Sequence, residues 1–206
     1  MPAIRYFAYG SNMLTAWLQS RCKSARATGI ASVSGFQLAF SKRSKDGSGK
    51  AMLVASDVPG TRVYGVLYEI DADEIEALDR SEGRGKGYER VEDFEVNADG
   101  NPVRVMTYMA DQSFIDAALT PYDWYLALAV NGAELHGLPG AYINALRATS
   151  SLSDAEPNRS TRKKSLAIIA GLEKGHESSR ACADCRKQDD SRLESKQGKA
   201  ENRRNA

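Results

Sequence analysis

The sequence predicts an α+β fold built around a strongly curved or closed sheet. Two observations support this class: about seven short strand-like segments come first along the chain, and the helical patterns come mostly after them. The length of 206 residues, with 42% hydrophobic and 27% charged side chains, provides a sizeable core for one compact domain with some chain left over.

The first elements are expected to be a strand, a tight loop and a short helix. Residues 4–9 are rich in aromatic side chains, which is typical of a buried strand. Residues 10–12 (Gly-Ser-Asn) favour a turn, and residues 13–21 place apolar side chains at helical spacing.

The middle of the chain is expected to hold six more strands and one helix. Two strands divide residues 25–41, and the others cover the runs 51–55, 62–70, 88–96 and 103–109. The last two form a hairpin that turns at Asp99-Gly100. Acidic residues at 71–74 predict the start of a helix over about 73–80. Residues 42–50 are polar and glycine-rich, which predicts an exposed, mobile loop.

The last part of the chain is expected to contain two helices and a tail. One helix begins near residue 121 and another covers 141–148. We place the catalytic domain at 1–150 and a polar, basic tail at 151–206, with a short helix over 160–173 and disorder elsewhere. The charges support this division, because residues 1–156 carry a net charge of −5 and residues 157–206 one of +6.

Several classes of protein are disfavoured by the sequence. No apolar run reaches the ~18 residues of a membrane helix, no signal peptide pattern opens the chain, and three cysteines make no disulfide framework, so we expect a cytoplasmic protein. No phosphate-binding glycine motif indicates a nucleotide cofactor, and the two histidines are too scattered for a zinc site. Cys182 and Cys185 form an isolated Cys-x-x-Cys pair, and the tail lacks the aromatic residues expected of a nucleic-acid binder.

The loop Tyr9-Gly10-Ser11-Asn12 is the first candidate for chemistry. A strand that ends in a glycine turn and opens a helix leaves backbone N–H groups without partners, and these can bind a carboxylate or a developing oxyanion. The alternative is a plain strand–helix turn, for which the same residues are well suited.

Glu82 is the second candidate. It follows the helix predicted over 73–80 and precedes the glycine-rich run 83–87, so it could be partly desolvated and suited to proton transfer. The alternative is a solvated carboxylate near Arg80 and Arg84. Six tyrosines form a third set, of which most are expected in the core and one or two in a pocket wall: Tyr9, Tyr68, Tyr88, Tyr108, Tyr125 and Tyr142.

These segments together resemble the γ-glutamylcyclotransferase family, which includes AIG2-like proteins. The resemblance rests on FAYGSNM at 7–13, RVYGVLYEI at 62–70, LDRSEG at 78–83 and HGLPGAYINAL at 136–146, and it covers about residues 3–148. It implies a small mixed barrel flanked by helices and an enzyme of the lyase or acyltransferase type without metal or cofactor. The tail after residue 150 has no counterpart in this pattern.

The resemblance also implies a reaction and a set of residues for it. Glu82 would be the catalytic acid and base, residues 9–12 the substrate loop, and Tyr108 and Tyr125 further pocket residues. A γ-glutamyl amino acid or peptide would be converted to 5-oxoproline and a free amine, as in glutathione metabolism. Two alternatives stay open: a cyclotransferase for γ-glutamylamines or a secondary metabolite, and a non-catalytic module that binds a small molecule. The sequence does not indicate an oligomeric state.

Overall fold

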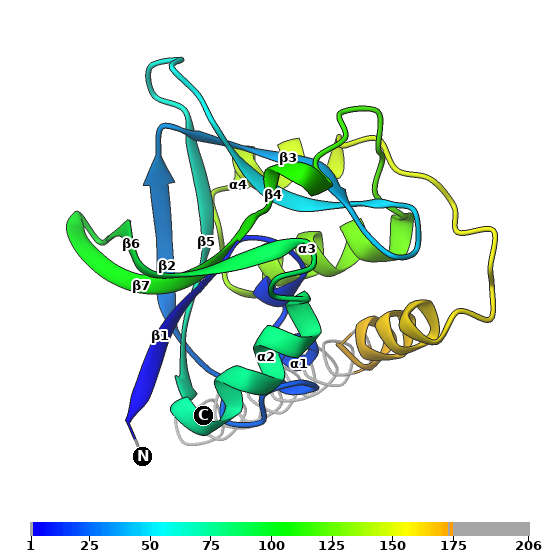
Figure 1. Ribbon diagram of the computed structural model, residues 1–206, viewed down its shortest axis with the longest axis horizontal. Helices are drawn as coiled ribbons and strands as arrows, with labels where there is room; N and C mark the ends of the chain where they lie inside the picture. Colours follow the sequence, from blue (N-terminus) through cyan, green and yellow to red (C-terminus); the bar gives the residue numbers. More distant parts are fainter. Residues whose placement is uncertain (1, 173, 175–206) are drawn as a thin grey trace, which may run out of the picture. The chain divides into compact units, whose positions relative to one another are not determined.

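The computed structural model describes residues 2–172 and 174 of the chain (Figure 1). Two compact units are distinguished, Met1–Leu166 and a second that begins at Ala167. Residues 160–172 are helical. The Cys182-x-x-Cys185 pair, most of the basic tail and the disorder expected after residue 174 lie outside the described residues.

Five strands of the first unit form a closed barrel in the order β1-β5-β2-β6-β7. Their bounds are β1 Ala3–Ala8, β2 Arg26–Ser34, β5 Arg62–Asp71, β6 Tyr88–Ala98 and β7 Asn101–Ala110. β1 lies between β5 and β7 and pairs parallel with β7, whereas the other pairings are antiparallel. The predicted α+β class with a small mixed barrel is therefore confirmed.

The predicted Asp99-Gly100 hairpin turn is present between β6 and β7. Both residues have positive φ angles, 50° and 85°, as a two-residue hairpin turn of this type requires. The register places Ala98 opposite Asn101, directly beside the turn. This turn was predictable because its chemistry is local.

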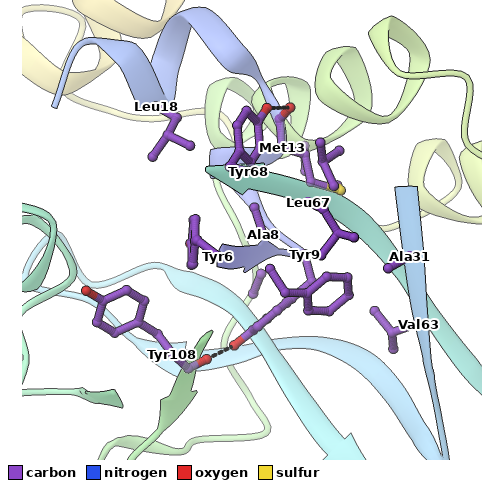
Figure 2. Packing of buried hydrophobic residues seen from close by; sticks show 14 of the residues in the cluster. Tyr6, Ala8, Tyr9, Met13, Leu18, Ala31, Val63, Leu67, Tyr68 and Tyr108 are labelled. Carbon is purple, nitrogen blue, oxygen red and sulfur yellow. Dashed lines mark hydrogen bonds between the residues drawn. The ribbon is translucent and has the colours of Figure 1, made fainter. Parts of the chain in front are cut away.

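The barrel interior is filled by aromatic and aliphatic side chains. Phe7 and Ala8 on β1 and Tyr68 on β5 are fully buried. Figure 2 shows β1 side chains packed among those of the neighbouring strands, with the Tyr68 hydroxyl donating to the Met13 carbonyl at 2.8 Å. The core therefore fixes both β1 and the loop that follows it.

Besides the helical residues 160–172, the described part of the chain contains four labelled helices and three short 3-10 turns. They are α1 Thr15–Gln19, α2 Ile75–Glu82, α3 Asp123–Leu135, α4 Gly140–Arg147, η1 Ser11–Met13, η2 Ala72–Glu74 and η3 Gln112–Phe114. α2 begins after acidic residues, as predicted, and buries Ile75 and Leu78. None of the described helices combines the length and the apolar character needed to cross a membrane.

Strands β3 (Phe36–Arg43) and β4 (Gly49–Ala55) form a separate two-stranded hairpin, coloured blue to cyan in Figure 1. Residues 42–50, expected as an exposed loop, contain the ends of both strands, and Lys42 and Ser48 are buried. Residues 44–48 do form a turn, in which Lys45 and Gly47 are exposed, but the expectation that the whole segment is an exposed loop is wrong. The physical reason lies far along the chain, because aromatic side chains of α3 cover this hairpin.

The segment that follows α4 packs against α3. The Asp154 carboxylate, whose side chain is fully buried, accepts hydrogen bonds from Trp124 Nε1 at 3.0 Å and Arg159 Nε at 2.7 Å. The bond from Arg159 holds the pKa of Asp154 well below its usual range. Ser165 is also buried. Packed structure therefore continues to at least Ser165.

Candidate active site

The loop after β1 is shaped by a close approach to β4. A Cβ atom at Gly10 would lie 2.8 Å from Ala51 Cβ, so a larger residue would force the loop and the hairpin apart. The 3-10 turn η1 begins at Ser11, and the first N–H groups of such a turn have no partner within it. The loop thus presents backbone donors next to the hairpin.

Glu82 is the last residue of α2, and its position follows from how that helix ends. Gly83 adopts the left-handed conformation with φ 71°, which stops the helix directly after Glu82. The buried Ile75 and Leu78 anchor the helix to the core. The Glu82 side chain is 16% exposed and faces the loop after β1, 70 positions earlier in the chain.

The side chains of Glu82, Arg21 and Asn12 form a closed triangle of hydrogen bonds. Arg21 Nη1 and Asn12 Nδ2 each donate to Glu82 Oε1 at 2.9 Å, and Arg21 Nη1 also donates to Asn12 Oδ1 at 2.7 Å. Asn12 Nδ2 donates further to the Tyr6 hydroxyl at 2.9 Å. Among the described residues, Glu82 Oε2 has no hydrogen-bond partner. One carboxylate oxygen is therefore fixed, and the other is available.

A small cavity of about 30 Å³ brings the sequence-predicted residues together. All seven predicted site residues line it: Tyr9, Gly10, Ser11, Asn12, Glu82, Tyr108 and Tyr125. Tyr88, a member of the predicted tyrosine set, lines it as well, together with Tyr6 and Ala51. This volume holds only one or two small groups, such as an amine or a carbonyl oxygen.

The hydroxyl groups of this cavity are engaged by the protein itself. Tyr9 donates to the Tyr108 carbonyl at 2.5 Å (Figure 2), and the Tyr108 hydroxyl donates to Asp79 at 2.7 Å. The Tyr125 hydroxyl accepts a hydrogen bond from the Ala51 backbone N–H at 3.1 Å. Tyr108 and Tyr125 are thus wall residues whose rings are held in place.

Burial keeps these phenols neutral at physiological pH. It raises the pKa of Tyr9 well above the ordinary value and the pKa of Tyr125 to about 12. The pKa of Tyr108 is likewise raised, first by burial and then by its hydrogen bond to Asp79. Glu82 is the carboxylate among the residues that line this cavity.

A larger cavity of about 410 Å³ adjoins the small one. Ser11, Glu82, Tyr88 and Tyr125 line both, whereas Gly10 and Asn12 line only the small one. The β3–β4 hairpin supplies another wall of the large cavity through residues 42–46 and Lys50. Glu82 therefore lies where a confined space meets a space large enough for a small molecule.

Sequence reasoning missed Arg21 and Tyr6. The sequence did hold one signal for Arg21: it follows Trp17 by four residues, a spacing that places two side chains on one face of a helix. In the structure the Arg21 guanidinium lies 4.8 Å from the Trp17 ring centroid. No local pattern indicated its contact with Glu82, 61 positions later. Tyr6 lies on a strand predicted only as core.

Residues 2–172 and 174 contain no cluster of three or more histidine, cysteine, aspartate or glutamate side chains that could hold a metal ion. The described histidine, His136, lies within hydrogen-bond distance of Thr15 and Tyr68, and burial lowers its pKa. It belongs to the packing between α3 and β5.

Comparisons with known proteins agree on one family. The model of the AIG2-like family matches residues 62–146. The chain is 30% identical over 175 residues to γ-glutamylcyclotransferase of Homo sapiens, covering 82% of this chain and 88% of the relative. The Bos taurus protein of the same name is 29% identical over the same length, with the same coverage. A solved structure named γ-glutamyl cyclotransferase has a TM-score of 0.72 at 25% identity, covering 82% of this chain and 99% of its own.

The extent of these matches corrects one expectation about the tail. The match to the human relative covers 82% of the 206 residues, which is more than residues 1–150 contain. The match therefore extends past residue 150. The sequence patterns had suggested that the family resemblance ends there.

Proposed function

Because the chain belongs to the γ-glutamylcyclotransferase family of enzymes, we propose that it converts γ-glutamyl amino acids or peptides to 5-oxoproline and a free amine. In the proposed reaction, Glu82 acts as both the general base and the general acid. The observation that carries it is the junction of the two cavities, where Glu82 Oε1 is bound by Arg21 and Asn12 and Oε2 has no partner among the described residues.

The reaction needs no external nucleophile. The α-amine of the γ-glutamyl group attacks its own γ-carbonyl carbon, closes a five-membered lactam and expels the amine that was bound through the amide. Holding the substrate in a folded conformation can contribute about 7–11 kcal/mol to lowering the barrier. The confined cavity beside Glu82 has room for the reacting carbonyl oxygen or amine, and the adjoining large cavity has room for the rest of the substrate.

Two proton transfers can share one carboxylate. Glu82 Oε2 accepts a proton from the α-ammonium, which frees the nitrogen lone pair for attack on the γ-carbon. The same proton is then donated to the departing nitrogen as the amide C–N bond breaks. The attacking nitrogen, which is positively charged once it is bonded to the γ-carbon, gives up a second proton to the freed carboxylate, and this proton passes to the released amine. The products are therefore the neutral lactam and a protonated amine. Arg21 and Asn12 hold Oε1 throughout, so the carboxylate keeps its orientation.

The backbone donors of residues 10–12 have the complementary role. They would stabilise the oxygen of the tetrahedral intermediate or bind the substrate α-carboxylate. Gly10 supports this role because its lack of a side chain lets the loop lie against Ala51. Tyr9, Tyr108 and Tyr125 form the neutral wall around the reacting atoms.

We also propose that the enzyme works in the cytoplasm. Cys22 is a buried free thiol in the part of the chain that the structure describes, which fits a reducing compartment.

The test is to incubate the purified full-length protein with a panel of γ-glutamyl dipeptides and to measure 5-oxoproline. Glu82→Gln keeps the side-chain shape and removes its basicity, so we expect kcat to fall by about 10²–10⁴-fold. Glu76→Gln is the matched control, because Glu76 lies on the same helix with its side chain 88% exposed.

Three outcomes would contradict parts of this proposal. Undiminished turnover by the Glu82→Gln variant would remove Glu82 from the chemistry. Release of 5-oxoproline from γ-glutamyl-lysine side-chain adducts, but not from γ-glutamyl-alanine, would indicate a γ-glutamylamine enzyme. A folded wild-type protein that is inactive on the whole panel would favour a binding module.

A further inference from the structure

Lys42 is a largely buried residue whose ammonium has no carboxylate within ion-pair distance in the described part of the chain. Its side chain belongs to a residue that is only 7% exposed, and its ammonium lies 4.4 Å from the centre of the Tyr88 ring. Among residues 2–172 and 174, no carboxylate lies within ion-pair distance of Lys42 Nζ and no group hydrogen-bonds to it. The protein removes part of the solvent from this charge and supplies no ion-pair partner, so an anion that enters the cavity would be favoured beside it.

Lys50, on the same hairpin, is a cation that does have an ion-pair partner. It lies directly opposite Lys42 in the β3–β4 register. Its ammonium binds Asp46 at 2.9 Å and Ser48 at 2.8 Å, and lies 4.4 Å from the centre of the Tyr125 ring. The hairpin therefore neutralises one of two facing lysines and leaves the other.

Lys42 lines the large cavity but not the small one that lies beside the backbone loop. Glu82 lines both. A Cβ atom added at Gly87 would lie 2.6 Å from Lys42 Nζ, so the ammonium rests against the backbone just before Tyr88. Its position is thus fixed from two sides, by Gly87 and by the Tyr88 ring.

The arrangement separates the two ends of a substrate. With Glu82 at the scissile amide, the reacting γ-carbonyl lies at the small cavity beside residues 10–12, and the rest of the substrate extends into the large cavity. In the proposed function the backbone donors of residues 10–12 bind the α-carboxylate of the γ-glutamyl part, so the anion that remains for Lys42 is one carried by the departing amine.

We propose that Lys42 binds a carboxylate on the departing amine, so that the enzyme selects γ-glutamyl amino acids and peptides over neutral γ-glutamylamines. This inference rests on the proposed cyclotransferase function. A hydrogen bond between two charged groups contributes about 1.5–3 kcal/mol, which corresponds to about 10–100-fold in kcat/KM.

The experiment compares γ-glutamyl-alanine with its C-terminal amide, which has the same shape without the carboxylate. We expect wild-type kcat/KM to be at least about 10-fold higher for the acid, with most of the difference in KM. Lys42→Met keeps the apolar stem, and the ratio should fall to about one. Lys42→Arg should restore part of the ratio, because the charge returns.

Lys45→Met is the matched control. Lys45 lies on the same hairpin and lines the same cavity, but it is exposed, so its removal tests general charge attraction. We expect this variant to keep the ratio. Loss of the ratio in Lys45→Met, or its persistence in Lys42→Met, would overturn the assignment to Lys42.

Failure of this inference can be told apart from failure of the proposed function. If wild type releases 5-oxoproline from both substrates with equal kcat/KM, the cyclotransferase function stands and the carboxylate site is wrong. If it releases none from either, the proposed function itself fails. Thermal unfolding checks each variant, and Lys42→Met should be at least as stable as wild type because it removes an uncompensated buried charge.

Discussion

The two walls of the large cavity differ in how their charges are neutralised. On the wall formed by α1, η1 and α2, Glu82 is paired with Arg21 and hydrogen-bonded to Asn12. On the hairpin wall, Lys50 is paired with Asp46, whereas Lys42 has only the Tyr88 ring beside it. On the first wall Glu82 has an ion-pair partner without a ligand, and on the second Lys42 has none.

This difference assigns proton transfer to the wall that contains Glu82 and substrate selection to the wall that contains Lys42. A group that moves protons benefits from an environment organised in advance, because no reorganisation is then needed during the reaction. A group that selects a substrate benefits from a charge that only the correct ligand neutralises. The following predictions test whether the two walls can be altered independently.

Among the variants that follow, Arg21→Met on the first wall is expected to have the largest effect. Methionine keeps the apolar stem over Trp17 but removes the hydrogen bonds to Glu82 and Asn12. We expect kcat to fall by about 10–100-fold, because a bond between charged groups contributes about 1.5–3 kcal/mol. The ratio between γ-glutamyl-alanine and its amide should persist, and steady-state kinetics on both substrates measure the two effects together.

Arg26→Met is the control for this variant, since Arg26 forms an exposed ion pair with Glu69 outside both cavities. If Arg21→Met kept its kcat but lost the preference for the acid, the roles assigned to the two walls would be reversed.

A smaller effect is expected from Asp154→Ala, which loosens the support behind the hairpin wall. Asp154 holds Trp124, and the Trp124 ring centre lies 4.7 Å from the Lys50 ammonium. Removing the carboxylate leaves Arg159 and Trp124 without their buried partner. We expect Tm to fall by about 5 °C or more and KM to rise more than kcat falls.

Asp57→Ala is the matched control, because Asp57 is exposed in the loop before β5. Differential scanning fluorimetry and steady-state kinetics measure both variants. An unchanged Tm in Asp154→Ala would show that the segment after α4 contributes little to the hairpin wall.

The smallest effect is expected from pH. Burial lowers the pKa of Lys42, while the charges of Glu82 and Asp46 act in the opposite direction and that of Lys45 acts with burial. Lys42 therefore loses its proton at a lower pH than an exposed lysine does. The preference for the acid over the amide should decline as pH rises through that range, by a few-fold at first.

The ratio of kcat/KM values isolates this titration, because both substrates share the same α-amine and the same Glu82 chemistry. The Lys42→Met variant should show a ratio that does not change with pH. A decline of equal size in that variant would assign the titration to another group.

Much of the barrel could be predicted because its signals are local. The turn at Asp99-Gly100 and the acidic start of α2 depend on neighbouring residues only. The tight Gly10 loop is similar, since the strand before it and the helix after it are visible in the sequence. Glu82 could be singled out because a glycine run directly follows its helix.

The hairpin wall could not be predicted because its environment comes from distant residues. Local composition at 42–50 resembles an exposed loop, yet Lys50 is covered by Tyr125, which lies 75 positions later, and Lys42 by Tyr88. The pairing of Arg21 with Glu82 and of Trp124 with Asp154 depends equally on tertiary structure. Composition alone cannot reveal which polar residues become buried.

The parallel pairing of β1 with β7 has a consequence for the order of events on the ribosome. β1 is made first, but Tyr6 finds its partner Met106 only after 100 further residues have been synthesised. Contacts between such distant segments form slowly. The nascent chain therefore carries the Tyr9–Asn12 loop in an unfinished setting until β7 emerges, and the cavity wall is completed only when Tyr125 of α3 follows.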